Sequence, residues 1–357
     1  MTLAPPSPPV ATGTWDVLYP RPEGRWSGYA QRGDSRRYGL YDPVTGLFET
    51  VRPEDDAALP ALACWLRRGE LLAYRPGRRA MVLTAEGTYA KVLRPRRVAP
   101  LVARIAAAEE AAREAGVGFP DLARLVGVDP DGVVRFAPLP GPSLHDVLVG
   151  TATGPDAATA VLDRVGAALA RFQDVAAAPV GDGAGTAAQE PATWAALAAR
   201  DAPELAGRYG EVLAELPAAP SDGVTVLVHG DLHDRNVVVG AAVGFLDLDL
   251  LGRGGPADDP GNLAAHLVLR ALQYGADGQW GRRAAARLVG GYIRHGGVAT
   301  SEAVTAVGAR TLFRLACLYR FRRRWRPLVP ALLDEAARWT SPAGLFPDEE
   351  NVWHPSE

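Results

Sequence analysis

The sequence predicts a two-lobed α+β fold, with a small antiparallel-sheet lobe followed by a mostly helical lobe. Short apolar runs separated by glycine and proline turns fill most of the first 137 residues, and such runs are typical of strand hairpins. The segment 138–142, PLPGP, contains too much proline to continue a strand or a helix, so we place the hinge there. Beyond it, apolar residues mostly recur at helical spacing.

Composition favours a globular cytoplasmic protein. The chain has 357 residues and 48% hydrophobic content, enough to build a core in each of two lobes. A net charge of −3 gives no general reason to expect a nucleic acid or an anionic membrane as partner, and no apolar run approaches the roughly 20 residues that span a bilayer. Cys64 and Cys317 lie too far apart in sequence to indicate a disulfide framework. No obligate protein partner is indicated.

The predicted small lobe covers residues 14–137. Before it, residues 1–13 are rich in proline and lack the pattern of a signal peptide, which indicates a disordered leader. An additional hairpin is expected at 38–51, around Pro43 and Gly46. The nucleotide-binding sheet and its single helix should follow. Strands are expected at 71–75, 80–84, 88–94, 122–128 and 133–137, and the helix at 100–113.

Lys91 lies in one of these strands and is the only lysine among 38 basic residues. Arginine replaces lysine readily on a solvated surface. It does not replace a compact ammonium that must fit between phosphate oxygens and a carboxylate. The single exception to an otherwise complete arginine bias is therefore a candidate functional residue.

The predicted large lobe covers residues 143–357 and is helical except for one compact β segment at 224–252. That segment contains two apolar strands around a turn at 240–244. Helices are expected at 156–175, 192–216, 257–273, 281–295, 301–324 and 328–339.

The β segment carries a dense group of polar residues between Val228 and Val237. A strand interior would not tolerate them, so we expect a loop at the edge of a cleft. Asp247 and Asp249 follow at the end of the next apolar strand. Carboxylates this close repel each other unless a cation intervenes.

Phosphoryl transfer accounts for this set of residues. Asp231 would accept or orient the proton of an attacking hydroxyl group. Asn236 and Asp247 would hold Mg²⁺ against the nucleotide phosphates, because hard cations prefer oxygen ligands. Lys91 would neutralise the α- and β-phosphates of ATP, and the sequence does not exclude GTP.

HGDLHDRN at 229–236 and FLDLD at 245–249 resemble the aminoglycoside phosphotransferase and choline kinase family, which has a protein-kinase-like fold. The resemblance covers roughly residues 71–333. It implies that Asp231 is the catalytic aspartate, that Asn236 and Asp247 bind magnesium and that Lys91 binds the nucleotide. DPGNLAAHL at 259–267 is similar to a helix opening of the family, which makes Asp259 the expected brace of the catalytic loop.

Two departures from the family pattern stand out. The glycine-rich GxGxxG loop is missing, and PGRR at 76–79 takes its place, so we expect Arg78 and Arg79 to cover the nucleotide phosphates, with Arg78 the residue to test. Glu109 and Glu110 both fit as the helical partner of Lys91, and we prefer Glu110.

Histidines in the loop allow a second interpretation. His229 and His233 could bind a transition metal in a hydrolase. Their four-residue spacing suits a helix, whereas this segment lies between strands. We therefore expect His229 to support the loop structurally, and leave the role of His233 open.

The acceptor remains open at this point. A small hydroxylated molecule is expected: an aminoglycoside or other antibiotic, a sugar, an amino alcohol or a nucleoside. A protein serine/threonine kinase and a catalytically silent nucleotide-binding module are the alternatives. The arginine run at 319–327 is expected to be a solvated helix face, and the acidic residues 348–350 a frayed terminus.

Overall fold

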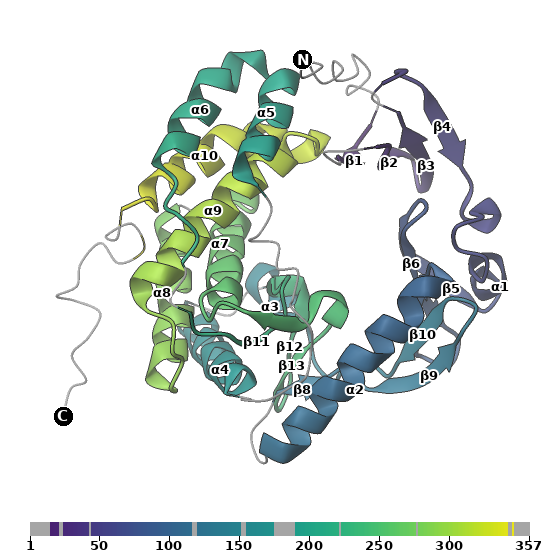
Figure 1. The fold of residues 1–357 in the computed structure, drawn as a ribbon, viewed down its shortest axis with the longest axis horizontal. Coiled ribbons are helices and arrows are strands. Elements are labelled where there is room, and N and C mark those ends of the chain that lie inside the picture. The colour runs from purple at the N-terminus through teal and green to yellow at the C-terminus, as the bar shows by residue number, and fades with distance from the viewer. Residues whose placement is uncertain are drawn as a thin grey trace.

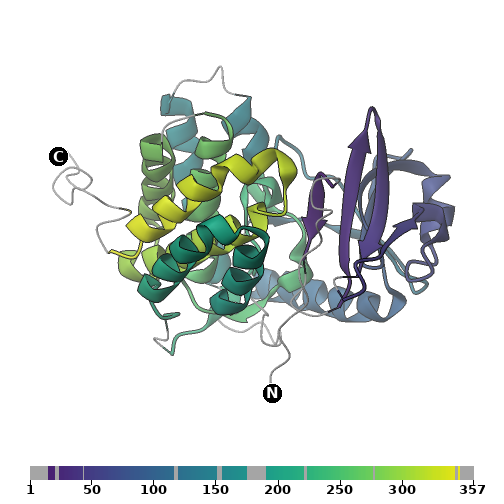
Figure 2. The same cartoon turned by 90° about the horizontal axis from the view of Figure 1, so that it is seen from above.

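The computed structural model describes residues 15–20, 24–42, 44–115, 120–150, 155–174, 190–220, 223–275, 278–341 and 345. The predicted leader at 1–13 and the acidic residues 348–350 lie outside the described residues. The chain divides into a β-rich part and a helical part, which Figure 2 shows side by side. The predicted α+β class, with its antiparallel sheet before its helices, is confirmed.

The sheet of the small lobe has five antiparallel strands in the order β5-β6-β7-β10-β9. Its strands are β5 (Gly69–Arg75), β6 (Arg79–Thr84), β7 (Tyr89–Leu93), β9 (Leu125–Asp129) and β10 (Val133–Phe136). The alternating pattern of β6 sends Ala80 and Val82 into a core with Val92. Helix α2 (Val98–Ala115) follows β7, as the sequence predicts. Its residues Leu101 and Ile105 belong to the main core, which links the helix to the large lobe.

The large lobe is built from eight helices within the part of the chain that the structure describes. They are α3 (Leu144–Val149), α4 (Pro155–Gln173), α5 (Pro191–Asp201), α6 (Ala206–Glu215), α7 (Asp258–Gln273), α8 (Gly278–Arg294), α9 (Ser301–Tyr319) and α10 (Val329–Arg338). Helices α7 and α9 approach closely because Gly261 has no side chain, and a Cβ there would lie 2.7 Å from the side chain of Val307. None of the helices in the described ranges is long and apolar enough to cross a membrane.

The compact β segment predicted at 224–252 lies in the large lobe. Strand β11 (Val226–Val228) pairs with β14 (Gly252–Gly254), and β12 (Val237–Val239) pairs with β13 (Val243–Phe245). Strand β8 (Asp121–Leu122), between α2 and β9, adds to β13 in parallel, so the small lobe is also tied to the hairpin. The predicted strands around the turn at 240–244 are confirmed.

A second sheet precedes the five-stranded sheet of the small lobe. It contains β1 (Val17–Tyr19), β2 (Trp26–Arg32), β3 (Ser35–Tyr41) and β4 (Phe48–Val51), followed by the short helix α1 (Leu62–Leu66). The hairpin predicted at 38–51 forms its second half. Its first half, β1 and β2, was not predicted from the sequence. Figure 1 shows the sheet reaching from the small lobe to the end of α9, on the side of the molecule opposite α2.

This N-terminal sheet is bonded to the large lobe. The Leu18 amide donates to the Phe321 carbonyl at 2.9 Å, and the Arg323 amide donates to the Asp16 carbonyl at 2.9 Å. Phe321 packs at 1% exposure with Trp15 and other aromatic residues of the sheet. The sequence predicts that this helix continues to residue 324, but α9 ends at Tyr319. These contacts explain the difference, because the residues after Tyr319 pair with β1 instead.

The prediction of one helix over 192–216 is wrong. The structure has α5 and α6 with a break after Asp201. Pro203 lies in this break and lacks the amide hydrogen that a continuing helix would need.

Candidate functional site

The loop 229–236 connects β11 to β12 and depends on a glycine. Gly230 has φ +81°, and a Cβ there would lie 2.7 Å from the Leu250 carbonyl oxygen. Only glycine adopts this conformation without strain or clash. His229 beside it is fully buried.

His229 fixes the shape of this loop. Its Nδ1 accepts a hydrogen bond from the Asp231 amide at 3.3 Å, and its Nε2 donates to the Leu246 carbonyl at 2.6 Å. Both ring nitrogens are therefore engaged in bracing the loop against the next strand, which leaves neither for a metal ion.

The hydrogen bonds of Asp231 that the structure shows involve its backbone amide and carbonyl, and not its carboxylate. The Asp231 carbonyl accepts a hydrogen bond from the Asn236 side chain at 3.1 Å. Among the residues that the structure describes, none donates to the Asp231 carboxylate. A partly buried carboxylate in this state can orient a hydroxyl group and accept its proton.

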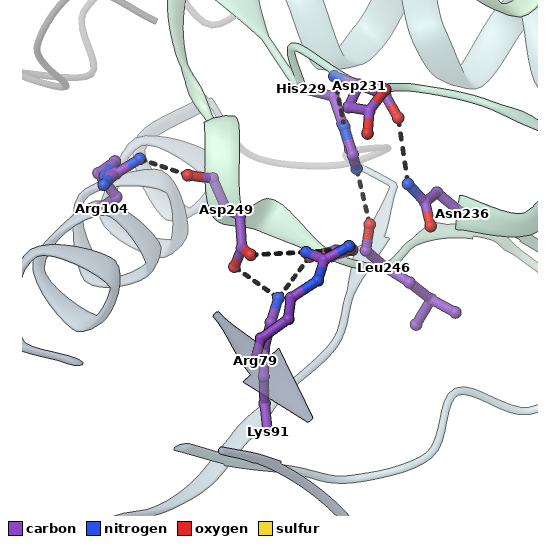
Figure 3. A network of polar contacts seen from close by, with 9 residues as sticks. Arg79, Lys91, Arg104, His229, Asp231, Asn236, Leu246 and Asp249 are labelled. Atoms are coloured by element: carbon purple, nitrogen blue, oxygen red, sulfur yellow. Dashed lines mark hydrogen bonds and ion pairs between the residues drawn. The ribbon is translucent and has the colours of Figure 1, made fainter. Parts of the chain in front are cut away.

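Two cations from the small lobe meet two carboxylates from the large lobe (Figure 3). Lys91 forms ion pairs with Asp247 and, at 2.5 Å, with Asp249. Arg79 lies 3.3 Å from Asp247 and 3.0 Å from Asp249. Lys91 is only 2% exposed, so it enters the site from the interior of the sheet.

The electrostatics of Asp247 follow from these partners. Burial alone would raise the pKa of its carboxyl group, but Lys91 and Arg79 outweigh burial and hold that pKa below its usual range. Asp247 is also the only non-glycine residue with positive φ in the described part of the chain, at φ 62° and ψ 57°. Aspartate tolerates this conformation better than most residues, and such strain is often found at functional sites.

Asn236 and Asp247 offer side-chain oxygens, the kind of ligand that hard divalent cations prefer. The amide of Leu246 donates to the Asn236 carbonyl at 2.9 Å, which sets Asn236 beside the strand end that leads to Asp247. Because the Asn236 amide nitrogen already donates to the Asp231 carbonyl, its side-chain oxygen is left as a potential ligand. This chemistry fits a hard divalent cation.

The outcome for the two predicted arginines differs. Arg78 is exposed in the turn before β6, whereas Arg79 begins the strand and reaches the carboxylates. Met81 pairs directly with Lys91 across β6 and β7. Because alternate residues share a face, Arg79 lies on the same face of the sheet as Lys91.

The expected pair between Lys91 and Glu110 is not formed. Glu110 is exposed and forms an ion pair with Arg113, one turn along α2. The residue of α2 that reaches the site is Arg104, which donates to the Asp249 carbonyl. Helix α2 therefore contributes a guanidinium that holds the backbone of the carboxylate segment, in place of a carboxylate that holds the lysine.

Asp259 lies behind the loop at full burial. Its carboxylate accepts hydrogen bonds from the amides of His229, at 2.6 Å, and Gly230, at 3.0 Å. Burial raises the pKa of Asp259 to about 6, although the neighbouring His229 and the two amides oppose the rise. The structure thus brings Asp259 to the position expected of a brace.

Sequence reasoning missed a buried ionic group around Asp234. Arg270 of α7 donates to both of its oxygens, at 2.6 and 3.0 Å, and His145 of α3 lies 2.7 Å from it. Burial would raise the pKa of Asp234, but the bonds from His145 and Arg270 lower it. This group ties the loop to two helices. Asp234 was visible in the polar run, but its partners lie 89 and 36 residues away and carry no local signal.

The hydrolase interpretation finds no support in the geometry. The ring of His233 lies 5.2 Å from that of His266, centroid to centroid, with the planes tilted by 34°, and His233 accepts a hydrogen bond from the Arg235 amide. Within the described ranges, no group of three or more histidine, cysteine, aspartate or glutamate residues is arranged to hold a metal.

Comparison with known proteins supports the same fold. The sequence profile of the phosphotransferase enzyme family matches residues 65–304. No curated protein matches the chain in sequence. Among solved structures, the amicoumacin kinase hAmiN in complex with AMP-PNP, Ca²⁺ and Ami is 14% identical, with a TM-score of 0.54, and the match covers 77% of this chain and 90% of that one.

Another similar structure is the aminoglycoside phosphotransferase APH(3'')-Id from Streptomyces rimosus. It is 21% identical with a TM-score of 0.46, and the match covers 71% of this chain and 92% of that one. The likeness to hAmiN confirms the predicted protein-kinase-like fold.

Proposed function

Because this chain belongs to the phosphotransferase enzyme family, we propose that it transfers the γ-phosphoryl group of ATP to a hydroxyl group of a small molecule, with Mg²⁺ as the metal cofactor. The observation that carries the proposal is the meeting of Lys91 and Arg79 with Asp247 and Asp249 between the lobes. Asp231 lies on the loop that leads from β11 into β12, the first strand of the hairpin that precedes these carboxylates. GTP would offer the same phosphates to these groups.

In the reaction, the acceptor oxygen forms a bond to the γ-phosphorus and the bond from that phosphorus to the β-phosphate oxygen breaks. ADP leaves, and the hydroxyl proton passes to Asp231. The carboxylate suits this role because it has no competing donor among the described residues. Its backbone is fixed on both sides by His229 and Asn236, so orientation is prepared in advance.

The cations from the small lobe would bind the nucleotide phosphates. We assign this role to Lys91 and to Arg79, because Arg79 contacts both carboxylates. Arg78, exposed in the turn before β6, stays a predicted further cation for the phosphates. Asn236 and Asp247 would hold the metal ion, which supplies positive charge to the phosphate oxygens. Lys91 and Asp247 neutralise each other in the structure described here. A phosphate and a divalent ion would satisfy the two partners separately, so the site stays balanced in charge on binding.

Calorimetry and a phosphotransfer assay test the proposal. ATP should bind in the presence of Mg²⁺, and Asp231→Asn should retain that binding while it lowers turnover on the order of 10²- to 10⁴-fold. Asp131→Asn, in an exposed turn, is the matched control. The absence of nucleotide binding, or unchanged turnover in Asp231→Asn, would contradict the assignment. Transfer to a peptide and not to small hydroxylated molecules would favour a protein kinase, and nucleotide binding without transfer to any acceptor would favour a silent module.

A further inference from the structure

Three arginines from both lobes gather near Asp231, and the proposed reaction does not use them. We call Arg75, Arg314 and Arg322 the acceptor-side arginines. Arg75 ends β5 of the small lobe, Arg314 lies in α9, and Arg322 follows α9 in the segment that pairs with β1.

Tyr19 of β1 joins two of them. The Arg75 guanidinium carbon lies 4.2 Å from the centroid of the Tyr19 ring, and that of Arg322 lies 5.7 Å from it. Arg322 also lies 4.8 Å from the Tyr319 ring. The N-terminal sheet therefore closes the side of the site at which arginines from the two lobes approach each other.

The third arginine is connected to the catalytic loop. Arg314 donates to the Asn262 side-chain oxygen at 3.1 Å, and the Asn262 amide donates to the Leu232 carbonyl at 2.8 Å. Leu232 follows Asp231 directly. Burial lowers the pKa of Arg314, Arg322 lowers it further and the Asp231 carboxylate opposes both, as expected when all three groups lie within one another's field.

The acceptor-side arginines lack carboxylate partners. No aspartate or glutamate in the described ranges forms an ion pair with any of them, and the Arg322 Nε is buried without a hydrogen-bond acceptor. Other inward-facing arginines behave differently. Arg270 pairs with Asp234, and Arg320 pairs with Asp201. Three guanidinium groups that share the field of one carboxylate, that of Asp231, favour an anion and disfavour a cation.

The ATP phosphates do not account for this group. Lys91 and Arg79 already face the carboxylate segment from the small lobe. Arg314 approaches the loop from α9, through Asn262 of α7. Arg75 belongs to the same small-lobe sheet, where it pairs with Arg79 across β5 and β6. Arg314 and Arg322 come from α9 and the segment after it, so these two cations approach from elements that the nucleotide cations do not use.

We propose that the acceptor carries an anionic group, a carboxylate, sulfate or phosphate, which binds Arg314 and Arg322 while its hydroxyl group faces Asp231. Arg75 and Tyr19 close over this group from the other side. The inference rests on the proposed phosphotransfer, in which the γ-phosphoryl group moves to that hydroxyl, its proton passes to Asp231 and ADP leaves. It specifies the substrate class and separates this chain from enzymes that act on polycationic acceptors.

The first experiment measures anion binding with the nucleotide site filled. Protein saturated with AMP-PNP and Mg²⁺ is titrated calorimetrically with inorganic sulfate at constant ionic strength, with chloride as reference. We expect one sulfate per chain, weakened about tenfold or more by Arg314→Gln and by Arg322→Gln. Arg322→Lys should retain most of the binding because it keeps the charge. Arg324→Gln, exposed on the same segment, should bind as the unaltered protein does.

The second experiment identifies the kind of anion. Glycerol, 3-amino-1,2-propanediol, glycerate and glycerol 3-phosphate share a hydroxylated three-carbon chain and differ in charge. The two anionic compounds should displace sulfate, and the stronger of them distinguishes a carboxylate from a phosphate. Equal displacement by the neutral or cationic compound would overturn the inference.

The two proposals fail in different ways. Sulfate binding no stronger than that of chloride, or unchanged in Arg322→Gln, would overturn the anionic acceptor and leave the phosphotransferase proposal standing. Failure of AMP-PNP to bind would contradict the phosphotransferase itself. Retained AMP-PNP affinity in the two glutamine variants verifies that they are folded.

Discussion

Lys91 forms an ion pair with Asp247, a residue 156 positions later in the chain. The pair joins β7 of the small lobe to the segment that follows β13 of the large lobe. Because Lys91 is the only lysine, its ε-amino group can be followed without interference from any other side-chain amine.

Lys91→Met should lower kcat/KM by about 10²-fold or more, because it removes a preorganised charge from the phosphate site. Lys91→Arg should rescue poorly, since a planar guanidinium does not fit the space of a buried ammonium. Calorimetry with ATP and Mg²⁺ separates binding from turnover. Wild-type ATP affinity in Lys91→Met would contradict the assignment of Lys91 to phosphate binding.

The burial of Lys91 gives an independent readout. An amine-reactive reagent should modify Lys91 slowly in the native protein, where it is 2% exposed, and rapidly after denaturation.

Features with a local signal were predictable from the sequence. The hairpin around residues 240–244 has two apolar runs and a turn, and the strand of Lys91 lies between clear turns. The fold class followed from the order of such elements. Asn236 and Asp247 flank the paired strands of one hairpin, so their proximity follows from local pairing alone.

The rest depends on register and on distant partners. Arg78 and Arg79 are neighbouring residues of the same type, so the sequence alone does not distinguish them. The pairing of Met81 with Lys91 shows that Arg79 lies on the face of the sheet that carries Lys91. The shorter α9 results from pairing with β1, about 300 residues earlier in sequence, which no local periodicity records. The same is true of Arg270 and His145, whose partner Asp234 lies in another element.

Phe321→Ala should detach the N-terminal sheet from the large lobe. Phe321 is 1% exposed, and its ring lies 5.2 Å from that of Trp26, edge to face. Its truncation should cost about 3–5 kcal/mol of unfolding free energy, and limited proteolysis should cleave the sheet region faster. Leu47→Ala, at a position 68% exposed, is the control. Unchanged proteolysis in Phe321→Ala would show that the backbone pairing alone holds the sheet.

Asp234→Ala should destabilise the protein by about 3–5 kcal/mol, because it leaves the Arg270 charge buried without its partner. Urea unfolding measures the loss. The pKa of Asp234 is lowered in the folded protein, so its contribution is present above pH 4 and is lost as pH falls below the ordinary value of 3.8. The variant should therefore lose less stability than the unaltered protein in that acidic range. A parallel loss in both proteins would show that Asp234 is not the group responsible.

Asp259 should have the opposite pH dependence. Burial raises its pKa to about 6, so the folded protein retains a proton that the unfolded chain releases near 3.8. The free energy of unfolding should then fall as pH rises from about 4 to 6, by on the order of 2–3 kcal/mol from this group. Asp259→Asn cannot ionise and should lack this component. The difference in unfolding free energy between the two proteins, measured from pH 4 to 8, isolates it.

Activity in Asp259→Asn gives a second readout of the same carboxylate. An amide has one oxygen, so it cannot accept from both the His229 and Gly230 amides as the carboxylate does. One loop amide would lose its partner, and turnover should fall about tenfold with little change in ATP affinity. A fall in ATP affinity with unchanged turnover would instead place the effect of Asp259 on the nucleotide, because a brace of the loop acts on Asp231 through the peptide that connects it to Gly230.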